Sequence, residues 1–418
     1  PAALPVIEIP EFHFHKVAPL FSNLPEAKQT VDIQPMEQFN QGWGTILYRT
    51  TLPETTLAGT TLKITEVHDW AQIYADGKLL ARLDRRKGEF TTTLPALKKG
   101  TQLDILVEAM GRVNFDKSIH DRKGITEKVE LISGNQTKEL KNWTVYNFPV
   151  DYSFIKDKKY SDTKILPTMP AYYKSTFTLD KVGDTFLDMS TWGKGMVWVN
   201  GHAMGRFWEI GPQQTLFMPG CWLKEGENEI LVLDLKGPTR ASIKGLKKPI
   251  LDVLREKAPE THRKDGEKLK LTGEKVGHEG AFTPGNGWQE VRFATPVKGR
   301  YFCLEALSPQ ANDNIAAIAE FDVLGADGKP VSREHWKIRY ADSEETRSGN
   351  RTADKIFDLQ ESTFWMTVDN VPYPHQLVID LSKVENVTGF RYLPRAEKGY
   401  PGMIKEYRVY VKPADFNY

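Results

Sequence analysis

The chain has 418 residues, of which 40% are hydrophobic and 27% are charged, as is typical of a globular protein. Its 56 basic and 55 acidic residues leave no bulk charge that would attract nucleic acid or an anionic membrane. No apolar run approaches the roughly 20 residues of a membrane-spanning segment. The length predicts about three domains, each with its own core.

Short runs in which apolar and polar residues alternate occur along the whole chain and predict β-strands. Helical periodicity is confined to pieces such as residues 249–256. Strands separated by Gly, Pro, Asn and Asp turns favour antiparallel sandwiches over a parallel α/β sheet, so the predicted class is all-β. The clearest alternating runs are residues 45–49, 71–75, 172–177, 196–199 and 376–380.

An internal repeat supports this class. Residues 73–78 and 197–202 each run from a strand into Asp76-Gly77 or Asn200-Gly201, pairs that favour a type I′ hairpin turn. Both copies then continue with a Gly-containing turn and an apolar strand, at an offset of roughly 125 residues. The repeat predicts tandem jelly rolls; the alternative is shared turn chemistry without common ancestry.

Residues 236–270 are rich in Lys and Arg and contain three prolines, which predicts a linker with one short helix. The basic residues are interleaved with acidic ones and lack an aromatic stacking platform. A solvated linker is therefore favoured over a nucleic-acid patch.

The segment 192–214 carries the most specific pattern, with Trp192-Gly193-Lys194-Gly195, then Val197 to Gly201, then Gly205 to Gln214. This pattern resembles the non-catalytic C-terminal half of glycoside hydrolase family 35 β-galactosidases. Further similar patterns extend the resemblance over nearly all of residues 35–255. It implies two galactose-binding-like jelly rolls packed beside a catalytic barrel. The further patterns are residues 44–49, 107–115 and 121–125.

The part from residue 276 onward resembles the coagulation-factor type C (discoidin-like) fold of carbohydrate-binding module family 32. The strands at 300–304 and 318–323, which close that domain in its usual form, come first here. A circularly permuted copy or two partial copies would explain this order. The expected domains are a connector from the missing barrel (1–22), jelly-roll sandwiches (23–165 and 166–237), a linker with a short helix (238–275) and a discoidin-like, carbohydrate-binding-like domain (276–418).

The type C resemblance implies two sets of site residues. Glu320, Asp358 and Thr363 match the positions of a structural calcium site, although Leu359 stands where a Gly usually allows the tight loop. No other cofactor is expected. For sugar binding we expect an aromatic platform with polar groups, and Met366 replaces a frequent His beside the platform. The expected sugar-binding residues are Trp365, Arg395 and Tyr400.

In the β-galactosidase-like part, we expect Arg206, Trp208 and Gln213 to form a face that docks against the missing barrel; alternatively, they are core and hairpin residues of the sandwich. Glu227-Asn228-Glu229 echoes an acid/base motif. It is better explained by a turn that enters an apolar strand, with both Glu side chains pointing outward. His13 and His15 would form half a metal site, but an ordinary strand is favoured.

No recognisable match to either catalytic-glutamate signature of the family occurs, so we expect the chain to be inactive alone. The leading hypothesis is an accessory, structural and carbohydrate-binding part of a secreted or periplasmic β-galactosidase that hydrolyses terminal non-reducing β-D-galactosides with retention. Its partners would be galactose-containing glycans and the barrel of the same polypeptide. The alternatives are a stand-alone glycan-binding protein or adhesin, and a hydrolase with unrecognised paired carboxylates.

Overall fold

A computed structural model describes residues 4–395 and 401–418, but not the side chains of residues 116 and 117. Antiparallel strands form almost all of its regular structure, which confirms the all-β class. Contacts divide the chain into two compact units. The first comprises Pro1–Gln29, Phe39–Leu47 and Thr144–Lys257, and the second comprises Thr30–Gln38, Tyr48–Trp143 and Ala258–Tyr418.

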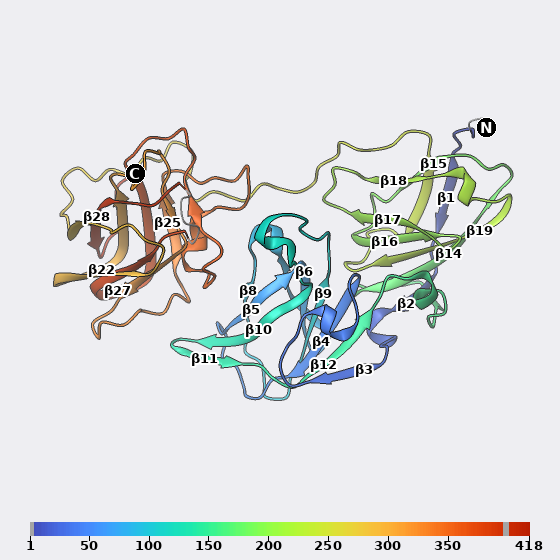
Figure 1. The fold of residues 1–418 in the computed structure, drawn as a ribbon, viewed down its shortest axis with the longest axis horizontal. Helices are drawn as coiled ribbons and strands as arrows, with labels where there is room; N and C mark the ends of the chain where they lie inside the picture. The colour runs from blue at the N-terminus through green and yellow to red at the C-terminus, as the bar shows by residue number, and fades with distance from the viewer. Residues whose placement is uncertain (1–3, 396–400) are drawn as a thin grey trace. The chain divides into compact units, whose positions relative to one another are not determined.

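The first unit contains a sandwich of two sheets, here called the second sandwich (Figure 1). One sheet has the strand order β13-β2-β14-β19-β16-β17 and the other β1-β20-β15-β18. Between them, the Trp192 ring makes edge contacts with Phe14 and Tyr173, at centroid distances of 5.0 and 5.1 Å. The elements are β1 Ile9–His13, β2 Lys16–Pro19, η1 Leu20–Ser22, α1 Tyr152–Ile155, β13 Ser161–Asp162, β14 Ala171–Leu179, β15 Thr185–Asp188, β16 Lys194–Val199, β17 His202–Trp208, β18 Thr215–Met218, η5 Gly220–Trp222, β19 Gly226–Asp234 and β20 Ser242–Leu246.

Segments expected to lie outside the second sandwich complete it. Strands β1 and β2 come from the expected connector, and β20 comes from the expected linker. Strand β2 pairs with β14, and β1 pairs with β20. The sandwich is therefore assembled from residues far apart in the sequence.

The predicted helix over residues 249–256 is wrong. These residues are extended: Gln214 donates to the Ile250 carbonyl at 2.9 Å, and the amides of Val253 and Arg255 donate to carbonyls of residues 212 and 210. Leu251 and Leu254 are exposed, so a helix here would have no apolar face to bury. A helix of this length is marginal in water, and backbone bonds to a neighbouring loop replace its internal ones.

The strands between residues 27 and 148 form what is here called the first sandwich. Within the second unit, β10 pairs with β5 and β11, β5 also pairs with β8, and β6 pairs with β7 and β9. Strands β3, β4 and β12 cross the boundaries between the two units. The elements are β3 Ala27–Thr30, η2 Met36–Phe39, β4 Thr45–Thr51, β5 Thr61–His68, β6 Trp70–Ala75, β7 Lys78–Asp84, η3 Arg85–Lys87, β8 Thr91–Thr93, β9 Gln102–Glu108, η4 Asp116–Ile119, β10 Gly124–Ser133, β11 Gln136–Glu139 and β12 Trp143–Phe148.

The two repeated hairpins have the same conformation. Asp76 and Gly77 have φ angles of 46° and 78°, and Asn200 and Gly201 have 47° and 85°, which confirms the predicted type I′ turns. The register shifts at the same step before each turn, between Ile73 and Tyr74 in one copy and between Val197 and Trp198 in the other. The first strand of each hairpin also pairs with the second strand after the hairpin, β6 with β9 and β16 with β19.

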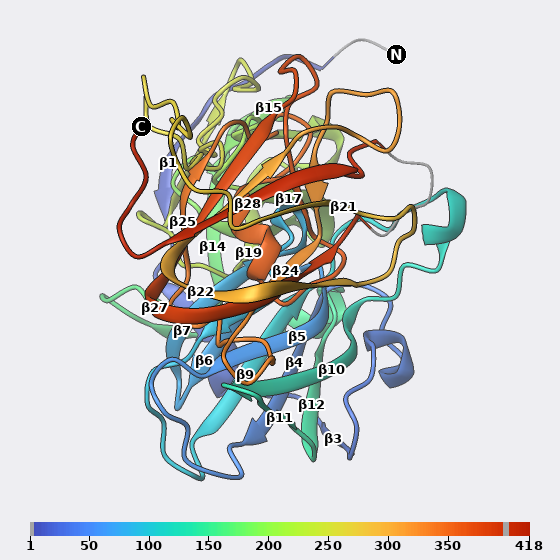
Figure 2. The same cartoon turned by 90° about the vertical axis from the view of Figure 1, so that its left-hand side faces the viewer.

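The C-terminal domain has one main sheet, with the order β21-β28-β22-β27-β24 and with β25 also paired to β27; Figure 2 shows β22 and β27 as long neighbouring strands. One core contains Phe282 and Phe302 from the earlier half together with Phe390 and Tyr407 from the later half. It is therefore one domain and not two partial copies. The elements are β21 His278–Ala281, β22 Gln289–Ala306, β23 Ala317–Ile318, β24 Glu320–Leu324, β25 Lys337–Ala341, η6 Ala353–Phe357, β26 Trp365–Met366, β27 His375–Leu393 and β28 Glu406–Lys412.

The later part of the expected linker packs on this domain. Leu269 lies in a small core with Cys303, Tyr340 and Phe416, and the Lys270 amide donates to the Asn417 carbonyl at 2.9 Å. None of the helices in the described ranges, 4–395 and 401–418, is long and apolar enough to cross a bilayer.

His262 fastens this segment to the domain through Glu344, whose side chain is fully buried. The His262 amide and Nδ1 lie 2.5 and 2.8 Å from the Glu344 carboxylate, which also accepts the Ala353 amide at 2.7 Å. Burial acts to lower the pKa of His262, but the hydrogen bond and charge of Glu344 outweigh it and raise this pKa above 6.5. The contribution of the His262–Glu344 pair to the free energy of unfolding is therefore complete below about pH 6.5. It is lost as the pH rises through the higher pKa of His262 in the folded state.

We expect His262→Gln to lower the free energy of unfolding by about 1.5–3 kcal/mol in mild acid, because a charge-assisted hydrogen bond is lost. The same substitution should remove the decline in stability that accompanies a rise in pH above 6.5, measured by comparing about pH 6 with about pH 8.5. Urea unfolding at both values checks this, with His335→Gln as the control because His335 is exposed. A variant that keeps the wild-type pH dependence would contradict the assignment.

Candidate functional site

The expected calcium residues lie together in the C-terminal domain. Glu320 opens β24, and Asp358 and Thr363 lie in the turn after η6. Thr363 Oγ1 donates to Asp358 Oδ2 at 2.7 Å, and the Gln360 amide lies 3.0 Å from both Glu320 Oε1 and Asp358 Oδ1. Leu359 adopts a φ of 65°, so a leucine occupies the left-handed position that favours glycine. The sequence pattern thus located a convergence of oxygen atoms.

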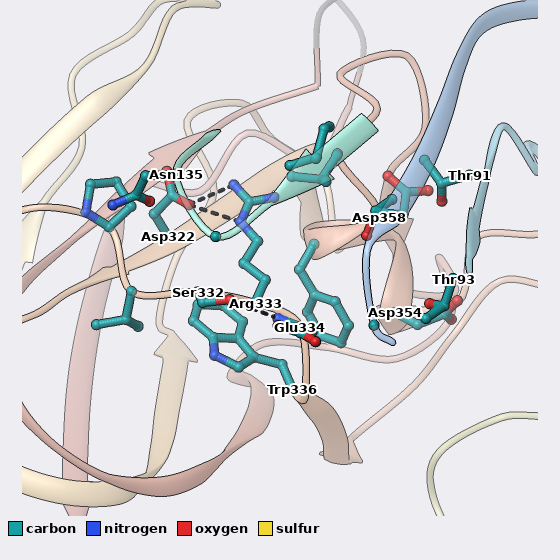
Figure 3. Close-up of a pocket in the computed structure, with 18 of the residues that line it drawn as sticks. Thr91, Thr93, Asn135, Asp322, Ser332, Arg333, Glu334, Trp336, Asp354 and Asp358 are labelled. Carbon is teal, nitrogen blue, oxygen red and sulfur yellow. Dashed lines mark hydrogen bonds and ion pairs between the residues drawn. The ribbon is translucent and has the colours of Figure 1, made fainter. Parts of the chain in front are cut away.

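Basic side chains approach the same carboxyl groups. The Arg333 guanidinium hydrogen-bonds Glu320. It also donates to Asp322 Oδ1, with Nε at 2.8 Å and Nη2 at 2.6 Å (Figure 3). Lys355 Nζ lies 3.9 Å from Asp358 Oδ2. Arg391 Nε donates to Asp322 Oδ2 at 2.9 Å. Sequence reasoning missed all three cations because none of them belongs to the ligand pattern.

The electrostatics of the cluster follow from its burial. Burial raises the pKa of Glu320 to about 8, against the opposing charge of Arg333. Burial likewise raises the pKa of Asp358 to about 6, against the charge of Lys355. The negative charge of Asp358 adds to the rise in the pKa of Glu320.

The residues present do not fit a calcium ion. Calcium takes about six to eight oxygen ligands, usually including ionised carboxylates. Each carboxyl oxygen of Glu320 and Asp358 already accepts a hydrogen bond from the protein, and one of these donors is the charged Arg333. The Gln360 carbonyl accepts the Thr363 hydroxyl at 3.0 Å.

The expected sugar-binding residues are differently placed. Trp365 is only 1% exposed and donates from Nε1 to the Ser343 carbonyl at 3.0 Å, so its ring presents no face to a sugar and a stacking role does not fit its position. Arg395 lies over the Phe364 ring at 4.3 Å, and its Nη1 lies 3.8 Å from Met366 Sδ. Tyr400 lies outside the described residues.

The expected docking residues lie on the edge strand β17 and in the loop before β18. Arg206 and Trp208 are two residues apart on β17, which places them on the same face of that strand. Arg206 is exposed, whereas Trp208 is half-buried beneath the Lys194 ammonium, 4.1 Å from its ring centroid. Gln213 is exposed in the loop before β18 and donates to the Thr215 carbonyl at 2.8 Å.

The turn at Trp192-Gly193-Lys194 is held by Asp234, a residue that sequence reasoning missed. Asp234 is fully buried at the end of β19. Its carboxylate accepts the amides of Gly193 at 2.7 Å, Lys236 at 2.8 Å and Gly237 at 2.9 Å, with Lys194 at 3.4 Å. The turn therefore owes its shape to a carboxylate about 40 residues away in the sequence, which local pattern analysis does not detect.

Glu227 and Glu229 point outward from β19, as predicted, while Asn228 between them is fully buried. Glu229 pairs with Lys174 at 2.9 Å and accepts from Tyr152 Oη at 2.7 Å. These contacts give Glu229 a structural ion pair with Lys174. The strand interpretation of this motif fits the structure.

A buried charge network organises the first sandwich. The Lys123 side chain is fully buried, with Nζ 2.7 Å from Asp69 Oδ2 and 2.8 Å from Asp121 Oδ2. Arg85 Nη1 bridges the same two carboxylates at 2.8 and 2.7 Å. The Asp69 and Asp121 carboxylates also accept the amides of Met110 and Val113, at 2.5 and 3.1 Å. The network thereby fixes both ends of the loop between β9 and β10.

Three family models match the chain. Residues 34–149 match "Beta-galactosidase, first all-beta domain", and residues 170–228 match "Beta-galactosidase, galactose-binding domain". Residues 340–418 match "F5/8 type C domain". The order of the three models agrees with the order of the sandwiches along the chain.

Curated relatives match the β-galactosidase part. Human beta-galactosidase-1-like protein 2 is 34% identical over 205 residues, covering 47% of this chain and 30% of the relative. A Xanthomonas manihotis β-galactosidase is 33% identical over 219 residues, covering 52% of this chain and 35% of the relative. The chain thus spans about a third of the length of these relatives.

Among solved structures, a Streptomyces avermitilis α-L-rhamnosidase complexed with L-rhamnose aligns with 96% of this chain and 46% of its own, at 9% identity. The TM-score is 0.21, which establishes no common function or arrangement. The family models and the curated relatives agree with each other. The chain is therefore built from non-catalytic β-galactosidase domains, the first all-β domain and the galactose-binding domain, followed by an F5/8 type C domain.

Proposed function

We propose that this chain is the accessory region of an exo-acting β-galactosidase that hydrolyses terminal non-reducing β-D-galactosides with retention. The supporting observation is the order of the two β-galactosidase models in a chain that spans about a third of its relatives. Retention requires two facing carboxyl groups about 5–5.5 Å apart. In this proposal a catalytic barrel elsewhere in the polypeptide supplies that pair.

The two sandwiches brace this barrel. The contact face includes Arg206 and Gln213, which are exposed, and Trp208, whose ring is half-buried under Lys194. A planar guanidinium suits a bidentate bond to a carboxylate on the facing surface. The C-terminal domain holds galactose-containing glycans, which keeps the enzyme near its substrate. We also propose a secreted or periplasmic location, where such glycans are encountered.

We expect this chain alone to release no nitrophenol from p-nitrophenyl β-D-galactoside. Reading the coding sequence upstream of Pro1 should reveal a barrel of about 250 or more residues, and the polypeptide that includes it should be active. An initiation codon directly before Pro1, together with galactoside binding by the chain alone, would instead establish a stand-alone glycan-binding protein or adhesin.

For the glycan-binding part, Arg395→Met should weaken the binding of a galactose-terminated oligosaccharide at least about tenfold, because a charged hydrogen-bond donor to the sugar is lost. Isothermal titration calorimetry measures this change. Arg408→Met is the matched control, since Arg408 lies on β28 and pairs with Glu279 at the surface. Equal affinities for the two variants would remove Arg395 from the proposed site.

A further inference from the structure

We infer that Arg333, assisted by Lys355, takes the place of a divalent cation in the C-terminal domain, so that the turn after η6 keeps its shape without calcium. This inference does not depend on the proposed function. It concerns the cluster of three carboxyl groups, on Glu320, Asp322 and Asp358, and three basic groups, on Arg333, Lys355 and Arg391.

The position of Arg333 carries the inference. Its side chain is 12% exposed and lies against two buried carboxylates, with Glu320 2% exposed and Asp322 3% exposed. The Glu320 oxygen that faces Arg333 is the group that a calcium ion would otherwise neutralise. A guanidinium with its fixed fork of donors satisfies both carboxylates at once, whereas an ion would need to displace it.

The charge balance points the same way. The three carboxyl groups carry at most three negative charges, and the three basic groups carry three positive charges. A calcium ion would therefore add two uncompensated positive charges to a largely buried cluster. Uncompensated charge in a buried site is strongly unfavourable, so the cluster as built opposes the ion.

Arg333 also makes the mechanical link that a structural ion would make. It lies in the connection between β24 and β25, which is held to β24 by the Val331 amide on the Val323 carbonyl at 2.9 Å. Through Glu320 and the Gln360 amide, this connection is joined to the turn that contains Asp358 and Thr363. One side chain thus ties together this connection, the start of β24 and the turn after η6.

The test compares the full-length chain after dialysis against EDTA and after addition of calcium. We expect substoichiometric calcium by plasma emission spectrometry and melting temperatures within about 1 °C of each other. One bound calcium per chain, or a clear loss of melting temperature in EDTA, would overturn the inference.

A variant sharpens the test. Arg333→Met keeps an apolar stem but frees the Glu320 oxygen, so we expect a lower melting temperature and a rise of at least about 3 °C on adding calcium. Arg300→Met is the matched control, because Arg300 pairs with Asp380 at 2.7 Å at the surface of the same domain, and it should not respond to calcium. If Arg333→Met fails to fold, the calcium content of the wild-type chain still tests the inference, because one bound calcium per chain would overturn it. A calcium response of equal size in wild type and Arg333→Met would contradict the replacement.

Discussion

Replacing Lys123 by methionine is expected to lower the free energy of unfolding by about 3–5 kcal/mol, the cost typical of removing one partner from a buried ion pair. Lys123 Nζ contacts Asp69, Asp121 and the Gly111 carbonyl, at 2.7, 2.8 and 3.0 Å. Without it, the cation that still contacts both buried carboxylates is Arg85, whose side chain is 27% exposed. Urea unfolding followed by tryptophan fluorescence measures the loss.

Lys138→Met is the control for this prediction. Lys138 pairs with Glu54 at 2.8 Å, but both side chains are about half exposed, and such a pair contributes less than about 1 kcal/mol. Equal stabilities of Lys123→Met and Lys138→Met would mean that the buried network contributes nothing beyond a surface pair.

The same network predicts an acid transition. Burial acts to raise the pKa of Asp121, but hydrogen bonds from Lys123, Val113 and Arg85 outweigh it and lower this pKa to about 2. A depressed carboxyl pKa gives stability that is complete above the unfolded value of about 4 and is lost as the pH falls through about 2. In Lys123→Met the pKa of Asp121 is depressed less, so this acid-dependent loss of stability should be smaller and should end at a higher pH.

Asp234→Ala is the second substitution with a large expected effect, a loss of at least about 3 kcal/mol, because each buried amide left without an acceptor costs about 1–3 kcal/mol. Three amides lie within 2.9 Å of its carboxylate, those of Gly193, Lys236 and Gly237. Thermal unfolding measures the loss, and hydrogen exchange at Gly193 should accelerate.

Two further variants separate the causes. Asp234→Asn retains one acceptor oxygen and should lose less stability than Asp234→Ala. Asp151→Ala removes an exposed carboxylate that makes no side-chain cap hydrogen bond, and it should change stability by less than about 0.5 kcal/mol. An Asp234→Ala protein as stable as Asp151→Ala would show that water replaces the lost acceptor.

Local sequence signals predicted the fold class and the hairpins well. Asn200-Gly201 and Asp76-Gly77 determine their turns through backbone preferences that need no tertiary information. Glu320, Asp358 and Thr363 were also located together, because a family pattern records their spacing. For residues 249–256, the helical periodicity predicted a helix that does not form. The backbone of these residues hydrogen-bonds to the backbone of residues 210–214 instead.

The charges that complete each site were not predictable in this way. Arg333 reaches Glu320 from the connection after β24. Lys123 precedes β10 and contacts Asp69, which follows the paired strand β5. No periodicity marks such residues, because in the sequence they look like ordinary surface lysines and arginines. Burial of Trp365 was missed for a similar reason: a tryptophan suits both a core and a sugar platform.

The second sandwich begins with β1 and β2 and is completed only by β14 to β20, after the whole first sandwich has been made. During synthesis β1 therefore cannot pair with its partner strand β20 until residues 242–246 have been translated. Until then the early strands keep open edges on the ribosome, where they can pair with the wrong neighbour. A chaperone that shields β1 and β2, or a slower rate of translation, should thus change the yield of folded protein more than the final stability.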